Sequence, residues 1–191
     1  MIYLATCFLV ALLATLFIMR SAMRHGHLSA DHDLSGPQKF HSRPVPRVGG
    51  LGVMAGVVAG VGIALVTGSP AAPYLLLLLA CSLPAFGAGI TEDLTKNVSP
   101  RRRLIATAVS AGLAIWLLDS VITKTDIPGV DLLIRWAPVS VLLTVFVVTG
   151  VANAVNIIDG FNGLASMCVL MMILALGYVA FQVGDTFVFT A

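Results

Sequence analysis

The chain has 191 residues, of which 58% are hydrophobic and only 10% are charged, and its net charge is +2. A soluble domain usually carries about 25% charged residues, so the composition argues against a soluble protein. The small net charge also argues against a partner as acidic as nucleic acid. The positions of the charges along the chain are therefore more informative than their sum.

Six apolar runs approach the roughly 20 residues that a helix needs to cross a bilayer. Each run is expected to be a helix, because a lone strand cannot satisfy its backbone hydrogen bonds in lipid. No positive charge precedes the first run, which argues against a cleaved signal peptide. We predict an all-α, polytopic membrane helix bundle that forms a single integral membrane domain, residues 1–191, with spans at about residues 1–19, 49–67, 74–90, 104–118, 137–154 and 164–183.

Glycines are concentrated at the start of the second run. Gly52, Gly56 and Gly60 follow one another at intervals of four residues, so they fall on one face of a helix. Small residues on one face allow two membrane helices to approach closely. We therefore expect this face to contact a neighbouring helix.

The basic residues divide unevenly between the two sides that six spans define. One side receives nine of the eleven Lys and Arg residues, and the other receives only Lys124 and Arg135. The side with more positive charge is expected to be the cytoplasm, which places the N-terminus in the periplasm. The same side holds Glu92, Asp93 and residues 153–163. The nine basic residues are Arg20, Arg24, Lys39, Arg43, Arg47, Lys96, Arg101, Arg102 and Arg103.

The polar segment between the first two runs carries a basic cluster. Lys39, His41 and Arg47 are suited to hold a phosphate or diphosphate. Pro44 and Pro46 stiffen the backbone between them, which argues against a floppy tail. The alternative is a basic loop that touches anionic lipid beside the membrane.

Two adjacent acids, Glu92 and Asp93, end the third run. Acids at the end of a span are costly to bury, which favours a functional role near a metal or a phosphate-bearing substrate. The alternatives are a solvated helix end, or ion pairs with the arginine triplet at residues 101–103.

The segment of residues 153–163 carries the sharpest signal. Asn153, Asn156 and Asp159 follow one another at intervals of three, so they lie near one another on a helix surface. Gly160 and Gly163 are expected to break the helix and let the backbone approach a ligand. Amide and carboxylate oxygens suit Mg²⁺ that is shared with substrate phosphates. The alternative is a polar network between helices with a glycine turn.

Taken together, these motifs resemble one family, the polyprenyl-phosphate N-acetylhexosamine-1-phosphate transferases of glycosyltransferase family 4. This family includes enzymes that initiate O-antigen and teichoic acid linkage units, and the peptidoglycan translocase is a relative. The motifs are Lys39-x-His41-x-x-Pro44-x-Pro46-Arg47-x-Gly49-Gly50, then Glu92-Asp93 with Ser99-Pro100-x-x-Arg103-Leu104, then Asn153-Ala-Val-Asn156-Ile-Ile-Asp159-Gly160-Phe161-Asn162-Gly163-Leu164.

The resemblance implies a reaction. N-acetylhexosamine-1-phosphate would pass from a UDP-sugar to undecaprenyl phosphate with release of UMP, which initiates synthesis of a cell-envelope polysaccharide. Mg²⁺ is the implied cofactor, and the implied location is the bacterial inner membrane with the active face in the cytoplasm. The implied partners are the UDP-N-acetylhexosamine, undecaprenyl phosphate and the lipid bilayer, and not nucleic acid. The oligomeric state stays open, with a homodimer as one candidate.

The resemblance also implies roles for single residues. Asn156 matches the family's asparagine metal ligand, and Asn162 matches a position near the uracil. The expected catalytic residues are Glu92, Asp93 and Asp159. The expected substrate-binding residues are Lys39, His41, Arg47, Asn153, Asn162 and Gly163.

The chain departs from the family pattern at several points. Glu92 stands where the family has Asp, and Asn162 stands where the peptidoglycan branch has Asp. Together with residues 44–50, Asn162 favours the O-antigen type. The family has a further metal-site Asp and a later basic loop, which the chain lacks after Leu164. The chain is therefore expected to be the N-terminal part of a larger transferase fold, inactive alone. The alternatives are a transporter or channel subunit, or a non-catalytic membrane remnant.

Overall fold

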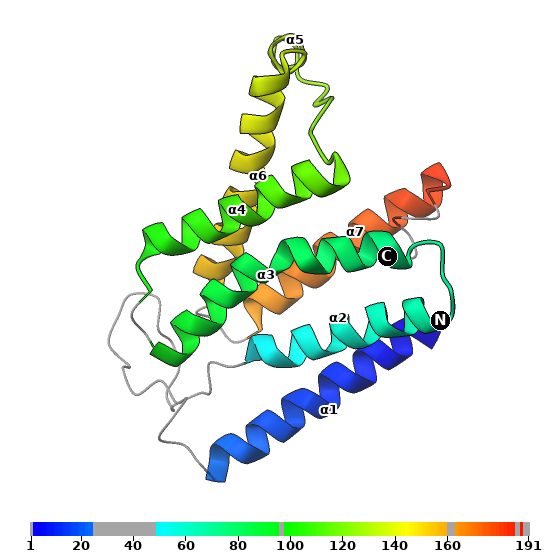
Figure 1. Cartoon of the computed structure of the whole chain (residues 1–191), viewed down its shortest axis with the longest axis vertical. Helices are drawn as coiled ribbons and strands as arrows, with labels where there is room; N and C mark the ends of the chain where they lie inside the picture. Colours follow the sequence, from blue (N-terminus) through cyan, green and yellow to red (C-terminus); the bar gives the residue numbers. More distant parts are fainter. Residues whose placement is uncertain (1, 25–48, 96–97, 160–162, 186–187, 189–191) are drawn as a thin grey trace. The chain divides into compact units, whose positions relative to one another are not determined.

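The computed structural model describes residues 2–24, 49–95, 98–159, 163–185 and 188. Within these ranges the chain is helical, and no strand occurs among them. The all-α prediction is confirmed. Figure 1 shows the helices, which are α1 (Ile2–Arg24), α2 (Gly49–Val66), α3 (Ala72–Thr95), α4 (Pro100–Leu118), α5 (Val130–Ile134), α6 (Ala137–Ile158) and α7 (Leu164–Val183).

Four of these helices, α2, α3, α6 and α7, are long and apolar enough to cross a membrane. The helix α1 has a shorter apolar stretch, Ala5–Ser21. Large apolar side chains are exposed along these helices, with Leu142 at 74% and Phe17 at 73%. Such exposure suits lipid, where apolar side chains need no partner within the chain. The polytopic membrane fold is confirmed, and the expected total of six spans stays a prediction for α1 and α4.

The contacts between residues divide the chain into two compact units. The first consists of residues 1–76 together with 155–191, and the second consists of residues 77–154. The expected single domain of residues 1–191 stays a prediction.

In the first unit, α1 and α2 lie side by side along their length (Figure 1). The glycine face of α2 forms the contact. A Cβ atom added at Gly56 would lie 2.8 Å from the backbone oxygen of Cys7 and 2.9 Å from the Cβ of Ala11. Added Cβ atoms at Gly52 and Gly60 would collide with Thr15 and Cys7. The expectation that this face contacts a neighbouring helix is confirmed.

In the second unit, polar side chains join α3 to α4. The interior proline of α3, Pro84, has no N–H to donate within the helix. The next residue, Ala85, donates its backbone N–H to the Ser110 hydroxyl of α4 at 3.0 Å. This bond fixes the middle of α3 against α4.

Residues 119–136, between α4 and α6, contain the one-turn helix α5, where the sequence predicts only a loop. The carboxylate of Asp131 accepts hydrogen bonds from the backbone N–H of Thr125 at 2.7 Å and its hydroxyl at 2.6 Å, and from the N–H of Asp126 at 3.1 Å. The hydroxyl and backbone bonds from Thr125, with the Asp126 bond and the charge of Lys124, lower the pKa of Asp131. These hydrogen bonds of Asp131 could not be predicted from the spacing of apolar residues.

Candidate active site

The second unit carries a polar cluster of three residues from three helices. The Arg103 guanidinium of α4 donates from Nη1 to both carboxylate oxygens of Glu92 on α3, at 3.1 and 3.3 Å. From Nη2 it donates to the Oδ1 of Asn153 on α6 at 3.1 Å. The side chains of Arg103 and Glu92 are only 18% and 28% exposed, so solvent screens this ion pair less than a surface pair.

The start of α4 explains why only one arginine of the triplet points into the unit. Pro100 occupies the first turn of α4, where the missing N–H costs nothing. Arg101 and Arg102 are exposed. Arg103 shares a helix face with residues one and two turns later, Thr107 and the buried Ala111.

Sequence reasoning therefore missed Arg103 as a site residue, although it belongs to the quoted motif Ser99-Pro100-x-x-Arg103-Leu104. The sequence signal was that motif itself, which specifies Arg at position 103 and leaves positions 101 and 102 open.

Two buried polar atoms close to this cluster have no hydrogen-bond partner among the described residues. They are the Nε of Arg103 and the Oγ1 of Thr149. Thr149 lies one turn before Asn153 on α6, on the same face of the helix. Buried polar groups are usually hydrogen-bonded, so these two atoms mark a place where a polar ligand group would find donors.

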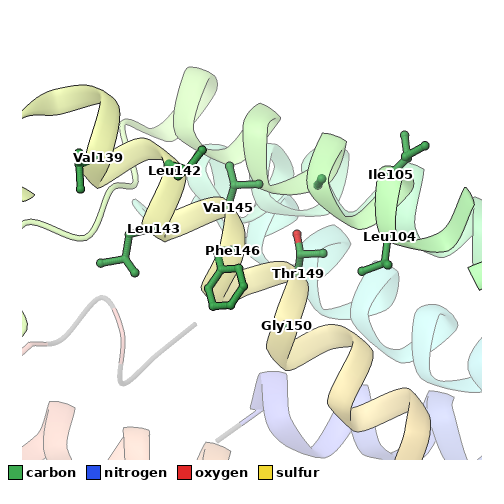
Figure 2. Close-up of a pocket in the computed structure, with 10 residues that line it drawn as sticks. Leu104, Ile105, Val139, Leu142, Leu143, Val145, Phe146, Thr149 and Gly150 are labelled. Atoms are coloured by element: carbon green, nitrogen blue, oxygen red, sulfur yellow. The ribbon is translucent and has the colours of Figure 1, made fainter. Parts of the chain in front are cut away.

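An open apolar groove of about 760 Å³ runs between α4 and α6 (Figure 2). Thr149 is the polar side chain in its lining, and Gly150 marks the end of the lined stretch of α6. Asn153 follows Gly150 by one helical turn, so the polar cluster lies just beyond this end of the groove. The other lining residues are Leu104, Ile105, Ala108, Val139, Leu142, Leu143, Val145 and Phe146.

The end of α6 carries the oxygen-rich segment. Asn156 is in the last turn of α6, Asp159 follows its end, and both are exposed. The structure confirms a break before α7, because Gly163 adopts a left-handed conformation with φ of 75° and precedes its first residue. Asn156 and Asp159 belong to the first unit, whereas Asn153 belongs to the second.

The donor set at the end of α6 fits Mg²⁺. One carboxylate and one amide oxygen, both accessible, match the few protein ligands that Mg²⁺ uses alongside substrate phosphates and water. No group of three His, Cys, Asp or Glu side chains suited to a metal occurs within the described ranges. The segment therefore resembles a site that shares its metal with a phosphate-bearing substrate more than a metal cage built from protein alone.

The remaining predicted site residues divide into two groups. Asp93, like Glu92, is half-buried at the end of α3, in the second unit. Lys39, His41, Arg47 and Asn162 lie outside the described residues. The structure therefore joins Glu92 to Asn153 through Arg103, and it places Asn156 near Asp159 along one segment.

Comparison with known proteins places this arrangement in a family. Residues 75–191, more than half of the chain, match Glycosyl transferase family 4. The chain belongs to that family. The predicted resemblance is confirmed at this level, and the match includes Glu92, Asp93, Arg103 and residues 153–163.

The chain is also similar to two curated proteins, both named phospho-N-acetylmuramoyl-pentapeptide-transferase, from Rhodopseudomonas palustris. The protein of strain BisB18 is 32% identical over 165 residues, and the protein of strain BisA53 is 29% identical over 164. In both comparisons the match covers 78% of this chain and 45% of the relative. The chain thus spans about half the length of these relatives. No solved structure matches it.

Proposed function

We propose that the protein transfers N-acetylhexosamine-1-phosphate from a UDP-sugar to undecaprenyl phosphate, with release of UMP. The observation that carries the proposal is the apolar groove between α4 and α6, which ends beside Arg103 and Asn153. A lipid phosphate needs this combination, because its long chain seeks an apolar surface while its head group needs a cation and hydrogen-bond donors. Membership of family 4 supports the same reaction class.

In the proposed reaction, an oxygen of the lipid phosphate attacks the phosphorus that carries the sugar. The bond between this phosphorus and the UMP oxygen breaks, and a lipid diphosphosugar forms. Such reactions depend on positioning and on neutralising charge. Asp93 and Asp159 are the carboxylate residues that we propose to be catalytic. The carboxylate of Glu92 already accepts two bonds from Arg103, so we assign Glu92 to orienting this guanidinium.

Asn156 and Asp159 are the residues proposed to hold Mg²⁺. When bound, the ion would neutralise negative charge on the diphosphate oxygens of the donor. Asn153 accepts a hydrogen bond from Arg103, which holds this part of α6 against α4. Lys39, His41, Arg47, Asn162 and Gly163 remain the proposed contacts of the donor. In the proposed orientation, the helix ends that carry Asp93, Arg103 and Asn156 lie at the cytoplasmic face of a bacterial inner membrane.

The identity of the sugar is a separate question within the proposal. The sequence favours an O-antigen-type N-acetylhexosamine donor, whereas the two relatives are phospho-N-acetylmuramoyl-pentapeptide-transferases. Both donor types are therefore tested. A transporter is less well supported, because the acidic residues within the four candidate spans, Glu92 and Asp93, lie at the end of α3 and not midway along a membrane path.

The test uses protein made from the complete reading frame, purified in detergent with undecaprenyl phosphate and Mg²⁺. UDP-N-acetylglucosamine, its galactosamine epimer and the N-acetylmuramoyl-pentapeptide donor are supplied in turn, and UMP is measured. Release of UMP with an N-acetylhexosamine donor supports the full proposal. Release of UMP only with the muramoyl donor would support the reaction class but refute the proposed N-acetylhexosamine donor. No release with any donor overturns the function.

A variant of the groove tests the observation that carries the proposal. A Cβ atom at Gly150 would meet nothing within 4 Å, so Gly150→Leu adds a side chain to the groove without a backbone collision. We expect the KM for undecaprenyl phosphate to rise about tenfold, equivalent to about 1.4 kcal/mol, with the KM for the donor unchanged. Gly112→Leu is the control, since Gly112 is on α4, is equally uncrowded and does not line the groove. An equal effect of both variants would refute the assignment of the groove.

A further inference from the structure

The segment of residues 119–136 joins the end of α4 to the start of α6 and exposes an unusual amount of apolar surface. Ile127 is 54% exposed, Leu132 and Leu133 are 69% and 62% exposed, and Trp136 is 69% exposed. None of these residues belongs to a helix long enough to span a membrane. In water they would form a costly apolar patch outside the spans.

The backbone of this segment is anchored deep along α6. Ile122 donates its N–H to the hydroxyl of Thr144 at 2.9 Å, and its carbonyl accepts a bond from the hydroxyl of Ser140 at 2.6 Å. Thr144 follows the first residue of α6 by seven positions, which corresponds to about 10 Å along the helix. Ser140 follows that first residue by three positions, so the extended chain at Ile122 lies about one to two turns inside the start of α6, and not beyond its end.

These bonds meet the requirement for non-helical backbone at membrane depth. Irregular backbone is tolerated there only when protein groups satisfy its N–H and C=O. Both backbone groups of Ile122 are bound to side chains of α6 that are themselves buried, with Ser140 and Thr144 only 5% and 6% exposed. The segment is thus built for surroundings that do not supply water to Ile122.

Three charged side chains of the segment, those of Lys124, Asp126 and Asp131, are paired within it. The carboxylate of Asp131 is occupied by three hydrogen bonds from Thr125 and Asp126. Lys124 and Asp126 form an ion pair at 2.7 Å, and their side chains are 71% and 77% exposed.

The short helix α5 separates an inward side from an outward one. Ile134 is 4% exposed and packs inward, whereas Leu132 in the helix and Trp136 just after it are each 69% exposed. Trp136 directly precedes α6, a place where tryptophan is enriched in membrane proteins because its ring suits the headgroup level.

We propose that residues 119–136 form an interfacial segment that dips into the bilayer leaflet at the end of α4 remote from Arg101, with Ile127, Leu132, Leu133 and Trp136 against phospholipid. The membrane surface around α6 continues onto this segment, because its backbone is bonded to the first turns of that helix. The segment therefore anchors the depth of α4 and α6 in the bilayer. The inference does not depend on the proposed transferase reaction.

Tryptophan fluorescence tests this placement, because the chain has only two tryptophans, Trp116 and Trp136. Both are replaced by Phe, and one reporter is introduced by Ile127→Trp or Leu132→Trp. These side chains are exposed, so the substitutions remove little packing. Lys124→Trp, three residues before Ile127 in the same segment, is the matched control. The full chain is reconstituted into phosphatidylcholine vesicles that carry bromine near the headgroup end of the acyl chains.

We expect the brominated lipid to quench both reporters, and aqueous iodide to leave them largely unquenched. The control at position 124 should show the opposite pattern. Quenching of both reporters by iodide, with none by the brominated lipid, would overturn the proposal and place the segment in water. Protection from both quenchers would also overturn it, because protein would then cover the patch. The two independent reporters guard against a local effect of one substitution.

Discussion

Arg103 of α4 donates a hydrogen bond of 3.1 Å to Asn153 of α6, although fifty residues separate them in the sequence. The same guanidinium pairs with Glu92 of α3. One side chain therefore connects three helices, and both partners, Glu92 and Asn153, belong to motifs that the sequence singles out. This arrangement leads us to treat Arg103 as the centre of the polar cluster in the second unit.

We expect Arg103→Ala to destabilise the protein by about 1–3 kcal/mol, because a partly buried carboxylate and an amide lose their charged donor. Thermal unfolding in detergent measures the effect. Arg101→Ala is the control, since Arg101 is an exposed arginine in the same helical turn. Arg103→Lys should recover part of the loss, since lysine keeps the charge but cannot reach three oxygens with a fixed fork. Equal stability of the Arg103→Ala and Arg101→Ala variants would show that the cluster contributes nothing measurable.

The contact between α1 and α2 gives a second prediction. Gly56→Val should destabilise the pair by about 1–3 kcal/mol, because the new side chain would overlap the backbone oxygen of Cys7 and the Cβ of Ala11. Gly62→Val changes the same residue type in the same helix, where an added Cβ meets nothing within 4 Å. Thermal unfolding of the two variants in one detergent checks the difference. If both variants unfold at the same temperature, the glycine face does not determine the contact.

Asp131 gives a prediction about pH. Its hydrogen bonds from Thr125 lower its pKa in the folded chain, so the ionised carboxylate stabilises the fold. This contribution is complete above the unfolded pKa of about 3.9 and is lost as the pH falls through the lower folded pKa. Asp131→Asn should therefore lower the Tm at neutral pH, and its difference from the parent should shrink below about pH 4. Asp119→Asn serves as the control, because Asp119 is exposed and Asn tolerates its left-handed backbone. A difference that is independent of pH would contradict this linkage.

The sequence predicts most of the fold, because apolar runs and glycine spacing are encoded locally. The glycine face of α2, the break at Gly163 and the membrane helices all follow from such patterns. The polar cluster is different, since the bond between Arg103 and Asn153 depends on which faces of α4 and α6 meet. The anchors of residues 119–136 likewise depend on hydroxyl groups of α6 that carry no signal in a hydropathy pattern.

The membrane orientation is tested by labelling. Nine basic residues on one side predict that Arg102 faces the cytoplasm and Lys124 the periplasm. Each position is changed to cysteine in a chain whose three native cysteines are replaced by alanine. An impermeant maleimide added to whole cells should label Lys124→Cys and not Arg102→Cys, and both should react after lysis. Labelling of only the Arg102→Cys variant in intact cells would reverse the proposed orientation.

The metal assignment of Asn156 is the sharpest prediction about the proposed reaction. Asn156 and Asn153 lie one turn apart on α6, but Asn153 is already bonded to Arg103, whereas Asn156 is exposed beside Asp159. We therefore expect substitutions at Asn156 and Asn153 to impair the protein in different ways. Asn156→Ala should lower kcat by at least about 100-fold at limiting Mg²⁺, with partial recovery as Mg²⁺ is raised, because a metal ligand is lost.

Asn153→Ala is the matched control, because it removes the same amide from the same helix. This variant should lower the Tm through the loss of the bond to Arg103, and its dependence on Mg²⁺ should equal that of the parent. The measurements are UMP release across a Mg²⁺ titration and thermal unfolding of protein made from the complete reading frame. A change in Mg²⁺ dependence in Asn153→Ala, with none in Asn156→Ala, would move the metal to the Arg103 cluster. That result would overturn our assignment of roles along α6, because Asn153, to which we assign a structural role, would then take part in binding the metal.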